Sequence, residues 1–494
     1  MQNSLFPDAG KNDHRTDPKF KYRLRGSYGA ETLKYCYQCG VCSAACPISK
    51  FIDIYRPNKI IELAKLGVCD LPQSNAFLFC SACTLCTKGC PQHVKVHEVM
   101  QALKEVACDD ANVREFLRSD FGGVLESLGR EMPFPVTYSW ICLRPPEESA
   151  EDTGFLSAVR TALDGYLSHP GPQNELKASS KKIAVIGSGP AGLTAAWELA
   201  KEGYRVTVFE RLQEPGGMLL TGIPGYRLPK DIINAEIGRI KKIGVKIETG
   251  VIVGQKFFDD LLDDGKFDAV FIAAGARTSR KLRVEGEELD GVEPALNFLR
   301  EYNLTGSAKA GKHVVVVGGG NVAMDAAGAA KRCGAETVRL YCLEDRENMP
   351  AHEWEIQEII DLGVEVNPSN GPKRILGENG SVTGAEFIRC VSVLDANGRF
   401  NPVYDEKKTQ TVEADMVITA IGQAPDLSFL GGGVGVLRGA VQVDPYTMET
   451  DLPGVYAGGD AASGTASLIE AITDGKRAAD SIARYLMSLE GVKG

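Results

Sequence analysis

Two stretches of the chain show the same order of apolar and amphipathic segments. Residues 183–186 and 314–317 are continuous apolar runs, and each is followed by a glycine-rich segment and an amphipathic stretch. Buried parallel strands read as unbroken apolar runs, whereas a helix covering a sheet repeats its apolar positions about every 3.6 residues. A second predicted strand follows each amphipathic stretch, RVTVFE at residues 205–210 and VRLYCL at residues 338–343. The pattern predicts two β-α-β units.

The first third of the chain has helical patterns instead. Residues 56–67 contain one apolar set, with Pro57 suited to a helix first turn and Gly67 to the stop. Residues 112–180 are polar or rich in helix breakers, with short helical pieces such as residues 155–167. We expect this segment to be a connector that packs along the domain after it and carries no chemistry of its own.

Length and charge narrow the functional class. A chain of 494 residues is too long for a single hydrophobic core of ordinary size, and its length suggests about three domains. The net charge is −10 and no basic patch is present, which disfavours nucleic acid as a partner. No apolar stretch approaches the roughly 18 residues of a membrane span, and the polar start is unlike a signal peptide. We therefore expect a cytoplasmic protein without a membrane span.

The number and spacing of the cysteines indicate metal binding or redox chemistry. The chain has 14 cysteines, and structural disulfides rarely persist in the cytoplasm. Eight of them form two runs with the pattern C-x2-C-x2-C-x3-C-P, which two-cluster bacterial ferredoxins use to hold two [4Fe–4S] clusters. The two runs are Cys36, Cys39, Cys42 and Cys46, and Cys80, Cys83, Cys86 and Cys90.

In that ferredoxin pattern the fourth cysteine of each run binds the other run's cluster. One cluster would then take Cys36, Cys39, Cys42 and Cys90, and the other Cys80, Cys83, Cys86 and Cys46. Structural zinc is the alternative, although it usually uses two separated C-x2-C pairs. The default for the isolated cysteines is a small buried apolar residue.

The glycine-rich segments carry the dinucleotide fingerprint. Gly187, Gly189 and Gly192 form G-x-G-x-x-G between a strand and a helix, and Glu210 ends the next strand about 20 residues on. Such a loop lets the backbone approach a pyrophosphate, while the acidic residue accepts from a ribose hydroxyl. Gly318, Gly320 and Ala323 fill the same positions in the second unit. Unless the second unit is vestigial, two sites predict two dinucleotides, a bound flavin and an exchangeable nicotinamide.

Beyond these loops the chain resembles the small (beta) subunit of glutamate synthase and its relatives, NADH-dependent ferredoxin:NADP oxidoreductase and dihydropyrimidine dehydrogenase. The resemblance covers residues 181–485. Its motifs are GGMLLTGIPGYRLPKDII (216–233), FDAVFIAAGA (267–276), ENMPA (347–351), ADMVITAIGQAPD (414–426) and LPGVYAGGDAASGTASLIEAITDGKRAA (452–479). The N-terminal cysteine runs resemble instead the small iron–sulfur subunit of heterodisulfide reductase.

The resemblance implies an α/β fold with two Rossmann-like domains, the NAD(P)H-binding one inserted in the FAD-binding one, after an α-helical ferredoxin-like domain with two [4Fe–4S] clusters. The expected ranges are 1–111 for the cluster domain, 112–180 for the connector, 181–300 and 413–494 for the FAD domain, and 301–412 for the NAD(P)H domain. The resemblance and the loops together give the expected cofactor-binding residues as Gly187, Gly189, Pro190, Ala191, Gly192, Glu210, Arg211, Gly217, Met218, Arg227, Val253, Ala274, Gly275, Gly459, Asp460, Ser467 and Leu468, with Gly318, Gly320, Asn321, Val322, Glu344 and Gly422.

The choice of coenzyme rests on a departure from the family. NADP-using members place Arg-Arg after the tyrosine that matches Tyr341, where this chain has Cys342 and Leu343. Glu344 follows, and a carboxylate there accepts from a free 2′-hydroxyl and repels a phosphate. We expect NAD(H) over NADP(H). The alternative is that Arg346 or Arg339 binds the phosphate.

The function expected is electron transfer between NAD(H) and a redox partner through FAD and two [4Fe–4S] clusters. Hydride transfer to a flavin needs no acid or base, so we name no catalytic side chain. We expect a subunit of a larger hetero-oligomer, electron-bifurcating complexes included, with ferredoxin or another oxidoreductase subunit as partner. The alternatives are a stand-alone NAD(P)H:ferredoxin oxidoreductase, a glutamate synthase small subunit feeding a large subunit, or a scaffold around an inactive second nucleotide site.

Overall fold

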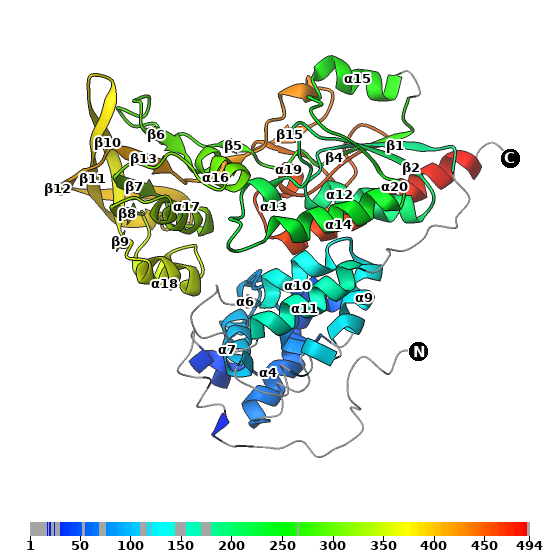
Figure 1. Ribbon diagram of the computed structural model, residues 1–494, viewed down its shortest axis with the longest axis horizontal. Helices are drawn as coiled ribbons and strands as arrows, with labels where there is room; N and C mark the ends of the chain where they lie inside the picture. Colours follow the sequence, from blue (N-terminus) through cyan, green and yellow to red (C-terminus); the bar gives the residue numbers. More distant parts are fainter. Residues whose placement is uncertain are drawn as a thin grey trace.

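The computed structural model describes residues 30–51, 55–68, 76–108, 121–143, 155–168, 179–263 and 266–491, with positions 17, 19, 20, 24, 115 and 117–119. Figure 1 shows three bodies: a helical one that contains the N-terminal third, and two that each contain a parallel sheet. We call the helical body the cluster domain with its connector, and the other two the first and second units.

The first unit is built on a five-stranded sheet in the order β17-β4-β1-β2-β3, in which every neighbouring pair is parallel. Its central strand, β1 (Lys182–Ile186), is buried from its second residue onward. Such apolar strands are expected where helices cover both faces of a sheet. The other elements are α12 (Pro190–Lys201), β2 (Arg205–Phe209), α13 (Met218–Thr221), α14 (Lys230–Lys242), β3 (Lys246–Glu248), α15 (Gln255–Asp263), β4 (Ala269–Ile272), β17 (Val455–Ala457), α19 (Asp460–Ser463) and α20 (Leu468–Gly491).

The second unit repeats this plan with a five-stranded sheet in the order β6-β13-β7-β8-β9. An antiparallel three-stranded sheet, β10-β11-β12, lies beside it. The rings of Tyr341 and Phe387 stack at 3.8 Å and join the two sheets. The elements are β6 (Val292–Pro294), α16 (Ala295–Thr305), β7 (His313–Val317), α17 (Asn321–Arg332), β8 (Thr337–Tyr341), α18 (Glu353–Asp361), β9 (Glu365–Asn367), β10 (Asn370–Glu378), β11 (Ser381–Leu394), β12 (Phe400–Glu413) and β13 (Met416–Thr419).

The predicted fold class is confirmed, since the second unit is inserted in the first. The chain leaves the first unit near β5 (Thr278–Ser279) and returns near β14 (Gln423–Ala424), and these short strands pair antiparallel. The predicted range 301–412 for the second unit needs correction, because it omits β6 and β13, which belong to the same sheet. Both strands are only three or four residues long, too short to show a periodicity of their own.

The cluster domain is helical, and the helix expected in residues 56–67 is α4 (Pro57–Leu66). Gly67 ends it in the left-handed conformation, with φ of 79°, and donates its N–H to Ala64 O and Leu63 O. The remaining elements are η1 (Ala30–Tyr35), α2 (Val41–Ala45), α3 (Ile48–Phe51), η2 (Ala76–Phe79), α6 (Leu85–Lys88), α7 (Val96–Cys108), α9 (Phe121–Glu131), α10 (Pro135–Leu143) and α11 (Phe155–Ser168).

The connector helices pack on the first unit, as the sequence predicts. Arg160 of α11 pairs with Asp231 of α14 at 3.2 Å, and Arg239 of α14 donates to the Tyr166 hydroxyl at 3.0 Å. In Figure 1, α10 and α11 lie directly below α14. In the part of the chain that the structure describes, no helix has the length and apolar character needed to cross a membrane.

Candidate functional site

A cavity of about 2710 Å³ lies where the three bodies meet. Pockets for single small molecules are usually roughly 300–1,000 Å³, so this one has room for more than one ligand. Every expected cofactor-binding residue except Gly192 lines it, as do Ser81, Ala82, Cys83 and Thr84 of the second cysteine run. Residues far apart in the sequence, from both glycine loops and one cysteine run, therefore share one space.

The three glycines of the first loop have separate roles. Gly187 has φ of +104°, and a Cβ there would lie 2.3 Å from Ala273 O, so the tight turn requires glycine. Gly189 precedes α12 and would meet nothing within 4 Å, which leaves its backbone open to the cavity. A Cβ at Gly192 would lie 2.0 Å from Gly187 O, so this glycine allows the helix to pack on the loop. These features fit a pyrophosphate at the N-terminus of α12.

Glu210, just after β2, is only 7% exposed and is held by its neighbours. The Ser188 N–H and hydroxyl donate to one of its carboxylate oxygens at 3.0 and 2.5 Å. The Leu212 N–H donates to the other oxygen at 2.8 Å. A carboxylate has about four lone-pair sites, so Glu210 retains capacity to accept from a ribose hydroxyl.

The end of the chain supplies the opposite wall of the first site. Gly459 has φ of +61° and precedes Asp460, whose pKa is raised to about 6, mainly by burial. The N-terminus of α20 also lines the cavity, and Glu470 accepts there from the Ser467 N–H at 2.9 Å. This helix end faces the cavity, and the partial positive charge of a helix N-terminus favours an anion there.

The second loop reproduces the first. Gly318 has φ of +144°, and a Cβ there would lie 2.3 Å from Ala420 O, while Gly320 faces open space before α17. A Cβ at Gly319 would lie 2.9 Å from Glu344 Oε2, which places that carboxylate beside the loop. The intact turn, with an acidic side chain next to it, fits a second dinucleotide.

The two arginines considered for phosphate binding are already paired. Arg346 contacts Glu353 through two nitrogens, at 2.8 and 2.5 Å. Arg339 donates to Glu365 at 3.2 Å. Neither arginine lines the cavity.

The cysteines fall into the two crossed sets. A small second cavity of about 20 Å³ is lined by Cys36, Cys39 and Cys42 together with Cys90. Burial raises the pKa of the Cys46 thiol, and the nearby Cys80 raises it further. Burial also raises the pKa of the Cys86 thiol, as do its neighbours Cys80, Cys83 and Cys46. Cys90 therefore lies with the first run and Cys46 with the second.

Among the residues that the structure describes, no three His, Cys, Asp or Glu side chains come close enough to share one metal ion. In a [4Fe–4S] cube each iron takes one thiolate, so its protein ligands do not converge on a single ion. Two sets of four thiols, one of them around a small cavity, fit such cubes.

The second cysteine run adjoins the cavity directly. Cys83 lines it, and its pKa is raised to about 12, mainly by burial, with a smaller contribution from Glu470 of α20. Behind this run, the buried Lys104 donates to Cys80 O at 2.5 Å and to Cys142 O. The Tyr138 hydroxyl donates to Phe79 O at 2.5 Å. A cluster at Cys80, Cys83, Cys86 and Cys46 would thus be the one nearer to the first dinucleotide site.

Sequence reasoning missed the connector's share of this site. Tyr138, Trp140 and Ile141 of α10 line the cavity, although no chemistry was expected of residues 112–180. One signal was available, because PVTYSWICL is apolar on nearly all sides, and a helix with that property is usually buried. Lys104 gave no signal, since nothing in the sequence places it beside the cysteines.

The fold and the site define a class: an oxidoreductase with two dinucleotide sites and an iron–sulfur domain. Residues 181–475 match the family model described as pyridine nucleotide-disulphide oxidoreductase, and residues 35–95 match a 4Fe-4S dicluster domain. The chain belongs to the pyridine nucleotide-disulphide oxidoreductase family and is related to glutamate synthase small chains, as the sequence motifs predict.

Three curated relatives show the extent of the likeness. The beta subunit of the NADP(+)-dependent formate dehydrogenase of Moorella thermoacetica is 38% identical, over 81% of this chain and 60% of its own length. The NADPH-Fe(3+) oxidoreductase subunit beta of Geobacter sulfurreducens is 32% identical, over 92% and 71% respectively. The glutamate synthase [NADPH] small chain of Azospirillum brasilense is 37% identical, over 66% and 70%. The chain thus spans only about three fifths of the Moorella subunit.

Among solved structures, FprA of Mycobacterium tuberculosis in complex with NADPH has a TM-score of 0.56 at 19% identity, covering 64% of this chain and 86% of FprA. Thioredoxin reductase of Lactococcus lactis has a TM-score of 0.50 at 22% identity, covering 63% of this chain and all of that one. At these identities the likeness concerns the fold. The two family models give the domain composition of an FAD- and NAD(P)-type iron–sulfur oxidoreductase.

Proposed function

We propose that this chain is an electron-transfer subunit that connects NAD(H) to a redox partner through FAD and two [4Fe–4S] clusters. The observation that carries the proposal is the shared cavity, which is lined by both glycine loops and by Cys83. When bound, FAD exchanges a hydride with a nicotinamide and single electrons with iron–sulfur clusters. The chain's own part is to hold the three groups close together.

The residues present fit these groups. The turn at Gly187, the open backbone at Gly189 and the carboxylate of Glu210 would hold the FAD pyrophosphate and ribose, with the N-terminus of α20 at the ring. Gly318, Gly320, Asn321 and Val322 would hold the nicotinamide nucleotide. The crossed cysteine sets would hold the two cubes, and thiols remain reduced in the cytoplasm, where we place the protein.

For the coenzyme we propose NAD(H), although the relatives named above carry NADP or NADPH in their names. Glu344 lies beside the second loop, and Arg346 and Arg339 are neutralised by Glu353 and Glu365. A 2′-phosphate at this site would be repelled by the Glu344 carboxylate, and neither Arg346 nor Arg339 would be available to bind it. A 2′-hydroxyl could instead donate a hydrogen bond to Glu344.

For the partner we propose another subunit of a larger complex, because several relatives are named as subunits or chains. A stand-alone NAD(P)H:ferredoxin oxidoreductase is the second candidate, since one chain carries all the expected redox sites.

The test is an anaerobic titration of the reconstituted protein with NADH and, separately, with NADPH. We expect NADH to bleach the visible flavin absorbance and to produce the EPR signal of a reduced cluster, with NADPH clearly slower. Rapid reduction of added ferredoxin would favour the stand-alone enzyme, and bleaching without it the subunit. No bleaching by either coenzyme would refute the proposal.

A further inference from the structure

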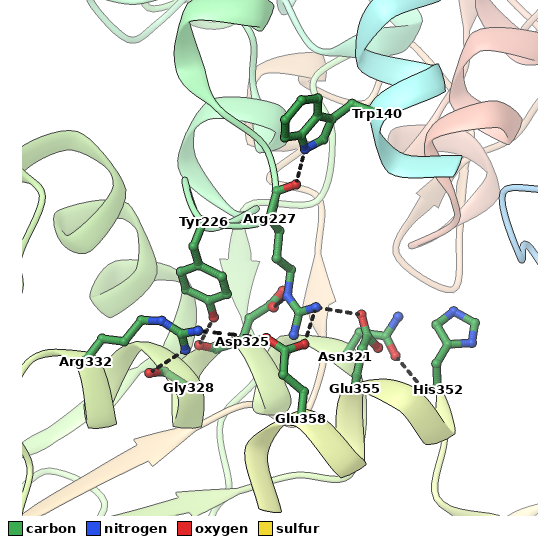
Figure 2. A network of polar contacts seen from close by, with 10 residues as sticks. All are labelled: Trp140, Tyr226, Arg227, Asn321, Asp325, Gly328, Arg332, His352, Glu355 and Glu358. Atoms are coloured by element: carbon green, nitrogen blue, oxygen red, sulfur yellow. Dashed lines mark hydrogen bonds and ion pairs between the residues drawn. The ribbon is translucent and has the colours of Figure 1, made fainter. Parts of the chain in front are cut away.

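The loop between α13 and α14 reaches across to the second unit at a polar junction. Figure 2 shows the Arg227 side chain pointing from this loop onto α17 and α18. Its Nε lies 2.5 Å from Asp325 Oδ1, and its Nη1 lies 2.9 Å from Glu358 Oε2 and 4.0 Å from Glu355 Oε1. The side chain is only 14% exposed. Hydrogen bonds between charged groups are the stronger kind, and burial strengthens them further.

The same residue is also held from behind by the connector. The Trp140 indole N–H of α10 donates to Arg227 O at 2.9 Å (Figure 2). The backbone of Arg227 is therefore tied to the cluster domain's connector while its side chain is tied to the second unit. The residue links all three bodies.

The neighbouring Tyr226 reinforces the contact. The Arg332 guanidinium of α17 lies 3.8 Å from the centre of the Tyr226 ring, a cation–π distance. The Tyr226 hydroxyl donates to Asp325 O at 3.4 Å. Two consecutive residues of the first unit thus hold one helix of the second.

The covalent connection between the two units is short. The chain crosses between them at the two-residue strands β5 and β14. Away from that crossing, Asn303 of α16 donates to Thr221 O of α13 at 3.1 Å. The two large sheets are separate, so the angle between the units depends on side-chain contacts such as those of Arg227.

We propose that Arg227 is a positioning residue that fixes the second unit against the first, so that the nicotinamide and flavin sites face each other at reacting distance. Asp325 lies one helical turn after Asn321, the first residue of α17, so holding Asp325 also holds the loop Gly318–Gly320. Hydride donor and acceptor must approach to about 3–3.5 Å, and a misplacement of about 1 Å can slow a reaction about 100-fold. The inference rests on the proposed function for its kinetic readout.

This role differs from the one implied by family resemblance, in which Arg227 contacts FAD. The two roles predict different results for Arg227→Met. Loss of a positioning contact leaves FAD bound but slows its reduction, whereas loss of a flavin contact lowers the FAD content.

The experiment compares Arg227→Met, Arg227→Lys, Asp325→Asn and the double variant R227M/D325N with the wild-type holoprotein. FAD and iron are quantified first. Stopped-flow absorbance then gives the rate of flavin reduction at saturating NADH, and hydrogen–deuterium exchange reports on α17 and α18. Arg374→Met is the control, because Arg374 makes a similarly short but more exposed contact to Glu386, at 2.6 Å, within the second unit alone.

We expect R227M and D325N each to keep FAD and iron, to reduce flavin at least about 10-fold more slowly, and to exchange faster in α17 and α18. The double variant should be no slower than the worse single variant, because the two residues act as one contact. Arg227→Lys should recover part of the rate, and R374M should match wild type.

Unchanged rates and exchange in R227M and D325N would overturn the inference, as would loss of FAD in R227M with normal exchange in D325N. If R227M fails to fold, D325N decides, since it leaves the Arg227–Glu358 pair in place. Wild-type protein that neither coenzyme reduces would refute the proposed function, while the exchange measurement would still test the contact.

Discussion

The buried carboxylate of Glu236 accepts the backbone N–H of Val136 at 2.6 Å and that of Thr137 at 3.0 Å. Glu236 belongs to α14 of the first unit, and the two donors lie in the first turn of α10, so one side chain caps a helix of another domain. Helix N-termini leave N–H groups without partners inside the helix, and the two oxygens of the Glu236 carboxyl group each accept one of them. The connector is therefore docked through its helix end.

This contact predicts a pH dependence of connector docking. Glu236 is fully buried, and burial raises its pKa to about 7, against the lowering effect of the two N–H groups and Arg239. Because the pKa of Glu236 is higher in the folded than in the unfolded protein, protonation of Glu236 stabilises the folded form. This contribution is fully present below about pH 4.5 and is lost as the pH rises through 7. The docking free energy should fall by up to roughly 3 kcal/mol between pH 5 and 8.

Hydrogen exchange of the α10 amides, corrected for intrinsic rates, measures this change. Glu236→Gln removes the titrating group and should make α10 protection independent of pH over that range. Equal pH dependence in wild type and E236Q would assign the effect to another group.

The crossed cysteine sets predict opposite results for two similar substitutions. Cys46→Ser should remove the cluster nearer to the flavin site, and Cys90→Ser the one farther from it, each lowering the iron content from about eight to about four atoms. NADH should still bleach flavin in both variants. An EPR signal from the remaining cluster should then appear quickly in C90S and slowly in C46S, because C46S lacks the intervening cluster. Cys333→Ser, outside both sets, is the control, and equal kinetics in C46S and C90S would contradict the assignment.

The loops and ligand runs were predictable from sequence because each is encoded locally. The glycine spacing that marks the turn at Gly187 lies within one β-α-β unit, and the cysteine spacing repeats in each run. The α4 stop at Gly67 is equally local, since a left-handed residue ends the helix wherever the chain goes next.

Contacts between domains could not be predicted in this way. Glu236 meets Val136, and Arg227 meets Asp325, each across roughly a hundred positions of sequence. Which surfaces meet depends on how the folded domains pack against each other. A single Glu or Arg in a helical or loop pattern is expected to be exposed to solvent, because charged residues are rarely buried. The same reason hid Trp140, whose indole reaches Arg227 only once the connector has docked.

The two glycine turns predict separable defects. Gly187→Ala would place a Cβ 2.3 Å from Ala273 O, and Gly318→Ala a Cβ 2.3 Å from Ala420 O, both at positive φ. Contacts under 3.0 Å require the backbone to shift, so each loop should lose its fit to a pyrophosphate. We expect G187A to purify with little FAD. G318A should keep FAD but bind NADH at least about 10-fold more weakly.

Flavin absorbance and an NADH titration followed by fluorescence check both results. Gly238→Ala on α14 is the control, because a Cβ there meets nothing within 4 Å. Loss of FAD in G318A as severe as in G187A would show that the two sites do not bind separate dinucleotides.

Coenzyme preference should depend on Glu344, whose carboxylate reaches the second glycine loop. A hydrogen bond to a charged group contributes about 1.5–3 kcal/mol, or roughly 10–100-fold in kcat/KM, so Glu344→Gln should reduce the preference for NADH over NADPH by about that factor. Adding an arginine in L343R/E344Q should move the preference further toward NADPH, because a guanidinium can form a hydrogen-bonded ion pair with the 2′-phosphate. Glu347→Gln removes an exposed charge three residues on and should leave the ratio unchanged. Steady-state rates with both coenzymes measure these ratios, and a wild-type preference for NADPH that survives in E344Q would place the determinant elsewhere.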